Sequence, residues 1–189
     1  MANYKDELVK ANNLLAEKGY IFLGQNMKFG GTSQFHMVKH LPESQRWELP
    51  VTEEMQMGMS LGMSMNDINI CSVYHRFDFL ILGINQLVNH IDKIRIMSDG
   101  QFKAKGLIIK TCIGSTKPMM PGPQHSQDYT EAFKLMFKDI KVVKLESPEQ
   151  IVPAYTEAME SDTPTLIVEI PDLYNVNLIY DIEKSKDIK

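Results

Sequence analysis

One acidic residue at the start of a glycine-containing helical segment is best placed to do chemistry. Glu53 lies in the stretch PVTEEMQMGMSLGMSM, residues 50–65. It is followed by Gly58 and Gly62, which are separated from each other by about one helical turn. Small residues at this spacing let a second backbone approach closely enough to exclude water from the acid. A carboxyl group buried in this way can hold a proton and donate a hydrogen bond. Taken alone, a glutamate at a helix start is usually structural, because the helix dipole favours it.

The spacing of Glu53, Gly58 and Gly62 resembles the pyrimidine-binding motif of thiamine diphosphate enzymes. Within that superfamily the chain is most similar to the beta subunit of the decarboxylating component of 2-oxo acid dehydrogenases, of the pyruvate and branched-chain type. A second anchor is GPQHSQ, residues 122–127, and the resemblance runs from about residue 22 to residue 174. It implies an α/β fold, a three-layer sandwich with a mostly parallel central sheet.

The resemblance assigns a role to the acid and to two aromatic residues. A family glutamate hydrogen-bonds to the aminopyrimidine ring of the cofactor and promotes its imino tautomer, and the spacing selects Glu53 rather than Glu54 for this role. The motif YHRFDF stands where the family has an aromatic pair. Phe79 is expected to stack on the aminopyrimidine. Phe77 is expected to lie at the cofactor or to pack in the core, and Gly58 is expected to line the cofactor site.

His125 is the second candidate catalytic residue. It lies in a loop with Gly122 and two prolines, where a rigid backbone can present a side chain into a cleft. In the resembled family this histidine assists proton transfer to the substrate-derived intermediate or the reductive acylation of lipoyl groups, tasks for which imidazole is suited. A lone loop histidine is more often a solvated bystander. His75 has no such motif, but it lies beside Phe77 on the same predicted rim.

Apolar runs alternate with segments of helical period, which favours a parallel sheet covered by helices on both faces. The segments after Leu23, Tyr74 and Ile113 should meet at one rim, because ligands of such sheets bind beyond the carboxyl ends of the strands. Thr52 is the expected cap of the glycine-containing helix. We expect strands over residues 20–23, 68–74, 105–113, 140–145 and 165–169, and helices over 6–18, from about 53, and over 79–94, 129–138 and 148–160.

Length and composition predict one domain over residues 1–180 and a flexible tail over 181–189. The formal net charge of −4 argues against nucleic acid as a partner. No apolar run is long enough to span a membrane and the start lacks a signal-peptide pattern, so a cytoplasmic protein is expected. Cys71 and Cys112 lie in apolar strand-like runs and are expected to be reduced, buried thiols.

Several positions depart from the family pattern. Gln25 and Asn26 stand where family members usually have acidic residues, and Glu48 with the following leucine replaces an Asp-Thr pair, so substrate specificity is open. Family members commonly hold potassium with an Asp and an Asn near the last strand. This chain has Ser161 and Thr163 there, so potassium is expected only if the intervening aspartate supplies a ligand.

The sequence lacks the diphosphate-anchoring Gly-Asp-Gly and Asn motif, through which magnesium holds the cofactor phosphates. We also expect this subunit to do without the further domain into which family beta subunits continue. We therefore expect a pyrimidine-domain subunit that shares thiamine diphosphate with a separate, alpha-type diphosphate-domain subunit holding the magnesium. Gly58, Gly62 and the methionine-rich helix are expected at an interface, with self-association and a lipoyl carrier protein as further partners.

Two alternatives remain open. A split transketolase-like subunit would keep the glutamate but transfer a two-carbon unit without lipoyl chemistry, and GPQHSQ favours the dehydrogenase type. A non-catalytic scaffold subunit would keep only the fold, which the altered loop over residues 24–50 makes credible.

Overall fold

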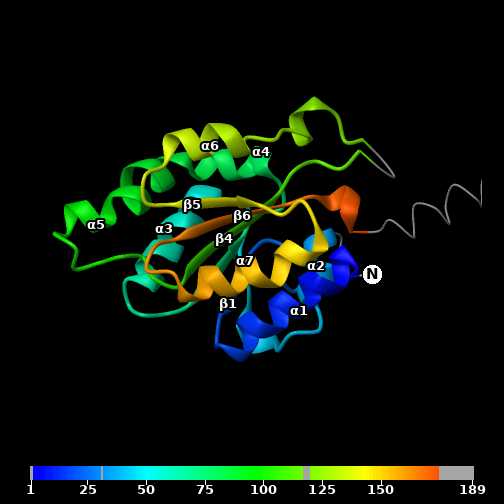
Figure 1. Ribbon diagram of the computed structural model, residues 1–189, viewed down its shortest axis with the longest axis horizontal. Helices are drawn as coiled ribbons and strands as arrows, with labels where there is room; N and C mark the ends of the chain where they lie inside the picture. The colour runs from blue at the N-terminus through cyan, green and yellow to red at the C-terminus, as the bar shows by residue number, and fades with distance from the viewer. Residues whose placement is uncertain (1, 31, 117–119, 175–189) are drawn as a thin grey trace, which may run out of the picture.

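The computed structural model describes residues 2–30, 32–116 and 120–174, and these form a six-stranded, entirely parallel sheet between two helical layers (Figure 1). The strands, in sheet order, are β2 (Arg46–Glu48), β1 (Ile21–Gly24), β3 (Ile70–Val73), β4 (Leu107–Cys112), β6 (Thr165–Glu169) and β5 (Lys141–Lys144). The helices are α1 (Tyr4–Glu17), α2 (Ser33–Val38), α3 (Glu53–Ser64), α4 (Phe77–Leu80), α5 (Ile94–Met97), α6 (Thr130–Met136) and α7 (Pro148–Glu160). The predicted α/β sandwich is confirmed, and its sheet is parallel throughout.

Alternating side chains of the strands build a core on each face of the sheet. In β1, Phe22 packs toward α1, α2 and α7, whereas its neighbour Leu23 packs toward α3, α4 and α6. Residues Ile108 and Ile109 of β4 divide in the same way. Figure 1 shows α1 and α7 together on one side of the sheet, with α4 and α6 on the other. Burial on both faces explains why the central strands are continuous apolar runs.

The strand order places a topological switch point at β1. The chain leaves β1 for β2 at one side, then crosses back to β3 at the other. Connections that depart in opposite directions leave a crevice at the carboxyl ends of the strands between them. The crevice lies beyond Gly24 and Val73, which are paired in the sheet register. A Cβ on Gly24 would overlap the Val73 carbonyl oxygen, so only glycine fits this close approach.

The structure differs from the predicted elements in three places. The short edge strand β2 and the helix α2 both lie in a region predicted as loop. The predicted single helix over residues 79–94 is a helical segment over residues 77–97 that changes between α, 3-10 and π geometry. In contrast, α7 and β6 have the predicted bounds. The predicted tail, residues 181–189, lies outside the described residues.

A buried ion pair joins the two central strands β4 and β6. Lys110 Nζ lies 3.0 Å from Glu169 Oε1, and both side chains are fully buried. The same carboxylate oxygen accepts a hydrogen bond from the Tyr155 hydroxyl at 2.9 Å, and Oε2 accepts from Tyr174 and from Gln34 Nε2. Buried charges need such partners, because an unpaired ion in the interior is strongly destabilising.

Within residues 2–30, 32–116 and 120–174, no helix is long and apolar enough to cross a membrane.

Candidate active site

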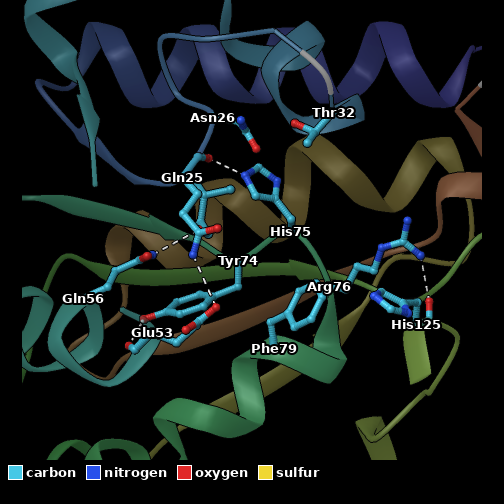
Figure 2. A pocket seen from close by; sticks show the side chains of 11 residues that line it. Gln25, Asn26, Thr32, Glu53, Gln56, Tyr74, His75, Arg76, Phe79 and His125 are labelled. Carbon is cyan, nitrogen blue, oxygen red and sulfur yellow. Dashed lines mark hydrogen bonds between the residues drawn. The ribbon is translucent and has the colours of Figure 1, made fainter. Parts of the chain in front are cut away.

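A pocket of about 290 Å³ lies at the switch point, beyond the carboxyl ends of β1 and β3 (Figure 2). Its walls come from the loop after β1, the first turn of α3, the segment after β3 and the loop after β4. The lining side chains that matter below are Gln25, Asn26, Glu53, Gln56, Tyr74, His75, Arg76, Phe79 and His125. Ligand sites of open α/β sheets occur at this place in the fold. Three sequence-predicted residues, Glu53, Phe79 and His125, therefore meet at one pocket.

Glu53 is the first residue of α3 and is only 7% exposed. Gln25 Nε2 donates to its Oε1 at 3.3 Å, and the Tyr74 hydroxyl donates to its backbone carbonyl at the same distance. Thr52 is the N-cap residue, but its hydroxyl donates to the Pro50 carbonyl and makes no hydrogen bond to the helix. The expected side-chain cap is therefore wrong, because the threonine hydroxyl is used in the turn before the helix.

Close backbone approach beside Glu53 depends on Gly83, a residue that sequence reasoning missed. A Cβ at this position would lie 3.3 Å from the Glu53 carbonyl oxygen, tighter than ordinary van der Waals contact. A Cβ on Gly58 would instead meet only the Gln86 side chain, at 3.7 Å, and one on Gly62 would meet nothing within 4 Å. The structure thus places Gly58 away from the pocket, and the tight approach comes from the facing helical segment.

Phe79 and His125 form the opposite side of the pocket from the loop after β1. Their rings lie edge-on, with centroids 5.4 Å apart. Arg76 Nη1 donates to the His125 carbonyl oxygen at 2.8 Å, and Asp78 Oδ1 accepts from the Gln127 amide at 3.3 Å. In Figure 2, Phe79 lies between Glu53 on one side and the Arg76 and His125 pair on the other. Contacts from Arg76, Asp78 and Phe79, at and just before the start of α4, therefore hold the histidine loop.

Phe77 does not line the pocket. It is fully buried, with its ring 4.9 Å from that of Phe133 and 5.7 Å from that of Tyr129, in edge-on geometry. The first residue of α4 points into the layer between the sheet and α6, whereas Phe79 points toward the site. The cofactor contact expected for Phe77 is corrected to a core role, which was the other reading of this residue.

His75 is fixed by the loop after β1. Its Nε2 donates to the backbone carbonyl of Gln25, which leaves Nδ1 without a proton. Burial lowers the pKa of His75 below its ordinary value of 6.5, so the ring is neutral at pH 7. Nδ1 is buried and has no hydrogen-bond partner among the described residues. The Nδ1 atom of the neutral ring is therefore a hydrogen-bond acceptor in the pocket wall that is available to a ligand.

Gln56 secures the strand ends beneath the pocket. Its Nε2 donates to the Leu23 carbonyl at 3.1 Å and to the Val73 carbonyl at 3.0 Å. Leu23 is the penultimate residue of β1 and Val73 is the last residue of β3, so Gln56 links the ends of the two strands. Sequence reasoning missed this residue, because the buried face of α3 carries several polar side chains and Gln56 does not stand out among them.

The loop after β1 is held by the edge strand β2. The backbone amides of Asn26 and Lys28 donate to the two oxygens of Glu48 at 2.7 and 2.8 Å. Asn26 has a φ of 53°, in the left-handed region that asparagine tolerates better than most residues. The departure from the family pattern at Glu48 therefore supplies the anchor of a pocket loop.

No group of three or more metal-ligating His, Cys, Asp or Glu side chains occurs in the part of the chain that the structure describes. Asp162, the substitute ligand for potassium, forms an exposed ion pair with Lys103 at 3.2 Å. The Ser161 hydroxyl donates to the Thr163 carbonyl at 2.8 Å. The potassium site therefore stays a prediction, for which these oxygen atoms are the candidate ligands.

The chain resembles known beta subunits in sequence. It is 28% identical over 130 residues to the pyruvate dehydrogenase E1 component subunit beta of Ascaris suum, which covers 69% of this chain and 35% of that protein. It is 26% identical over 159 residues to the 2-oxoisovalerate dehydrogenase subunit beta 2 of Arabidopsis thaliana, covering 83% and 43%. The resemblance to 2-oxo acid dehydrogenase beta subunits is confirmed. The match spans less than half the length of each of those relatives, and no protein-family model matches this chain.

Two solved structures have a similar fold. A split gene transketolase, described as an inactive beta4 tetramer, superposes with a TM-score of 0.59 at 14% identity, over 89% of this chain and 50% of that chain. A putative thiamin diphosphate-dependent enzyme from Mycobacterium smegmatis gives a TM-score of 0.62 at 15% identity, over 90% and 31%. This chain therefore shares the fold of these two proteins over about nine-tenths of its length.

The pocket of this beta-subunit-like chain fits the ring portion of thiamine diphosphate. The buried carboxyl group of Glu53 accepts a hydrogen bond from Gln25 at Oε1, and its Oε2 has no hydrogen-bond partner among the described residues. Phe79 adds an aromatic side chain to the same pocket. A heteroaromatic ring with hydrogen-bonding nitrogens matches these two groups in chemistry.

Proposed function

We propose that this chain is the pyrimidine-domain subunit of a thiamine diphosphate-dependent 2-oxo acid dehydrogenase or decarboxylase, and that Glu53 activates the aminopyrimidine. The observation that carries the proposal is the joint placement of Glu53, Phe79 and His125 around one pocket at the switch point. Three residues from separate segments, each singled out by a resemblance in sequence, line the same pocket. The similarity to named beta subunits supports the same function.

Each residue has a task that its surroundings suit. Bound thiamine diphosphate supplies the electron sink for decarboxylation of a 2-oxo acid. Glu53 holds or transfers a proton at its carboxyl group, in a place where 7% exposure limits competition from water. The Phe79 ring provides an apolar surface for the cofactor ring. His125, held through its own backbone carbonyl by Arg76, keeps its imidazole free to move a proton at the substrate.

An alpha-type partner completes the site in this proposal. The magnesium that holds a diphosphate group needs oxygen ligands besides the phosphates, and the described residues offer no cluster of three or more acidic side chains for it. The relatives are named as beta subunits, and one structural neighbour is named as the product of a split gene, so a divided enzyme has parallels. The partner would hold magnesium and the diphosphate, while this chain provides the pyrimidine side.

The test is a comparison of two neighbouring glutamates. The chain is co-purified with its diphosphate-domain partner, and thiamine diphosphate binding is measured by calorimetry alongside decarboxylation of pyruvate and 3-methyl-2-oxobutanoate. Glu53→Gln should lower turnover by about 100-fold or more, the usual range for a lost proton-transfer group. Glu54→Gln is the matched control, because this exposed side chain lies outside the pocket lining and accepts hydrogen bonds from Asn85 and Gln86. Equal turnover in both variants would contradict the role of Glu53.

A second variant separates the two enzyme classes. His125→Ala should reduce acyl transfer more than cofactor binding if the chain serves a dehydrogenase. Unchanged acyl transfer would instead favour the transketolase-like alternative. A complex that binds no thiamine diphosphate at all would leave only the scaffold alternative standing.

A further inference from the structure

Arg76 brings to the pocket a positive charge that forms no ion pair with a carboxylate of the described residues. Its side chain lines the pocket and is half-buried. Among the described residues, its one hydrogen bond goes from Nη1 to the carbonyl oxygen of His125, a neutral group. No ion pair involves it in that part of the chain. A partly buried cation without a counter-ion is costly, so its presence calls for an anionic partner.

The charges around the pocket are divided between its two sides. Glu53 lies on one side of Phe79, and Arg76 lies with His125 on the other (Figure 2). The loop side presents the neutral amides Gln25 and Asn26. Burial is the main cause of the lowered pKa of His75, and the charge of Arg76 adds to it. The pocket thus has an acidic side, formed by Glu53, and a cationic side, formed by Arg76. Among the described residues, no anionic side chain pairs with Arg76.

The guanidinium has donors left for a ligand. A guanidinium carries five N–H donors in a planar fork, and the bond from Nη1 uses one of them. The remaining donors can form the paired hydrogen bonds that a carboxylate accepts. The hydrogen bond from Nη1 holds the guanidinium group beside the contact between Phe79 and His125.

We propose that Arg76 binds the carboxylate of the 2-oxo acid substrate and thereby selects acids over neutral carbonyl compounds. This inference rests on the proposed function, because it names the group that recognises the substrate in the same pocket. The carboxylate lies against Arg76, and the adjacent oxo group then lies close to His125. Arg76 is a specificity residue in this arrangement, and it also positions the His125 loop.

The experiment compares an acid with its neutral ester. The cofactor-free complex of the full chain and its partner is titrated calorimetrically with pyruvate and with methyl pyruvate, and no turnover occurs under these conditions. The variants are Arg76→Gln, Arg76→Lys and the control Arg95→Gln, which removes the same charge from an exposed position on α5 outside the pocket. The steady-state preference of the loaded complex for acid over ester is measured in parallel.

Wild-type complex should bind the acid more tightly than the ester. Arg76→Gln should weaken binding of the acid by about 10- to 100-fold, the loss expected for a charge-assisted hydrogen bond, with little change for the ester. Arg76→Lys should fall between, and Arg95→Gln should match wild type. Equal weakening of acid and ester would mean that Arg76 only holds the His125 loop, and the inference would be overturned.

The outcomes also separate this inference from the function on which it rests. A wild-type complex that binds thiamine diphosphate and decarboxylates the acid, but shows no preference for acid over ester, overturns the role of Arg76 alone. The same holds if neither compound binds the cofactor-free complex at millimolar concentration. A complex that fails to bind thiamine diphosphate overturns the proposed function, whatever Arg76 does.

Discussion

The ring of Phe79 lies edge-on to the imidazole of His125, at an interplanar angle of 80°. The two residues come from different segments, one following β3 and the other following β4. Their contact is accompanied by the hydrogen bond from Arg76 to the His125 backbone. The histidine loop is therefore fixed by the start of α4, and substitutions there should be felt at His125.

The two phenylalanines of α4 should respond differently to truncation. Phe77→Ala should lower the free energy of unfolding by about 3–5 kcal/mol, as expected for a fully buried aromatic side chain. Phe79→Ala should cost clearly less stability, because its ring is only half-buried, yet it should weaken binding of thiamine diphosphate to the assembled complex. Urea unfolding and calorimetry measure these effects. Equal losses of stability would contradict the separation into core and pocket roles.

Gly114 should be intolerant of any side chain. A Cβ there would overlap the carbonyl oxygen of His125 and the Cα of Ser126, both backbone atoms that cannot rotate away. Gly114→Ala should therefore displace the histidine loop and reduce turnover, with a smaller effect on the β4 core beneath it. Turnover and proton spectra of the loop residues are the measurements. A variant with wild-type turnover would show that the loop position does not matter for catalysis.

Gly62 separates packing within the chain from packing against a partner. A Cβ there would meet nothing within 4 Å, and the residue is exposed. Gly62→Ala should raise the stability of the isolated chain by about 0.5–1 kcal/mol, because alanine is the better helix former. If this face of α3 contacts another subunit closely, the same change should weaken assembly. Thermal unfolding and sedimentation measure the two effects, and unchanged assembly would count against the predicted interface.

His75 should make stability depend on pH in acid. Burial lowers the pKa of the folded-state imidazole below 6.5, so the unfolded chain binds a proton first as the pH falls through 6.5. The free energy of unfolding should therefore decrease from pH 6.5 downwards, until the folded-state pKa is passed. His75→Asn should flatten this decrease, whereas replacing the exposed His36 in the same way should leave it intact. Parallel curves for wild type and His75→Asn would contradict the shift.

Strong local patterns made much of the fold predictable. The helix α7 opens with proline after a serine, and β6 is a short apolar run, so both were located to the residue. The edge strand β2 carries no comparable signal, because its three residues include the exposed Trp47 and no apolar alternation. Its role depends on Glu48 reaching the loop after β1, a contact that only the folded chain reveals.

The site was predictable where chemistry follows a motif. Glu53, Phe79 and His125 each lie in a recognisable pattern, and all three line the pocket. Arg76 was missed although it lies within YHRFDF, because a charged residue between aromatic residues reads as a solvated position. Gly83 was missed because a glycine required by a facing backbone has no pattern of its own.

The buried ion pair of Lys110 and Glu169 limits which substitutions the chain can accept in evolution. Each charge is tolerable in the interior only because the other is 3.0 Å away, so loss of either one leaves an ion stranded among apolar side chains. Replacement of both by apolar residues removes that penalty. Among descendants of this sequence, the two positions should therefore covary, with lysine and glutamate retained together or lost together, and lineages that hold only one of them should be rare.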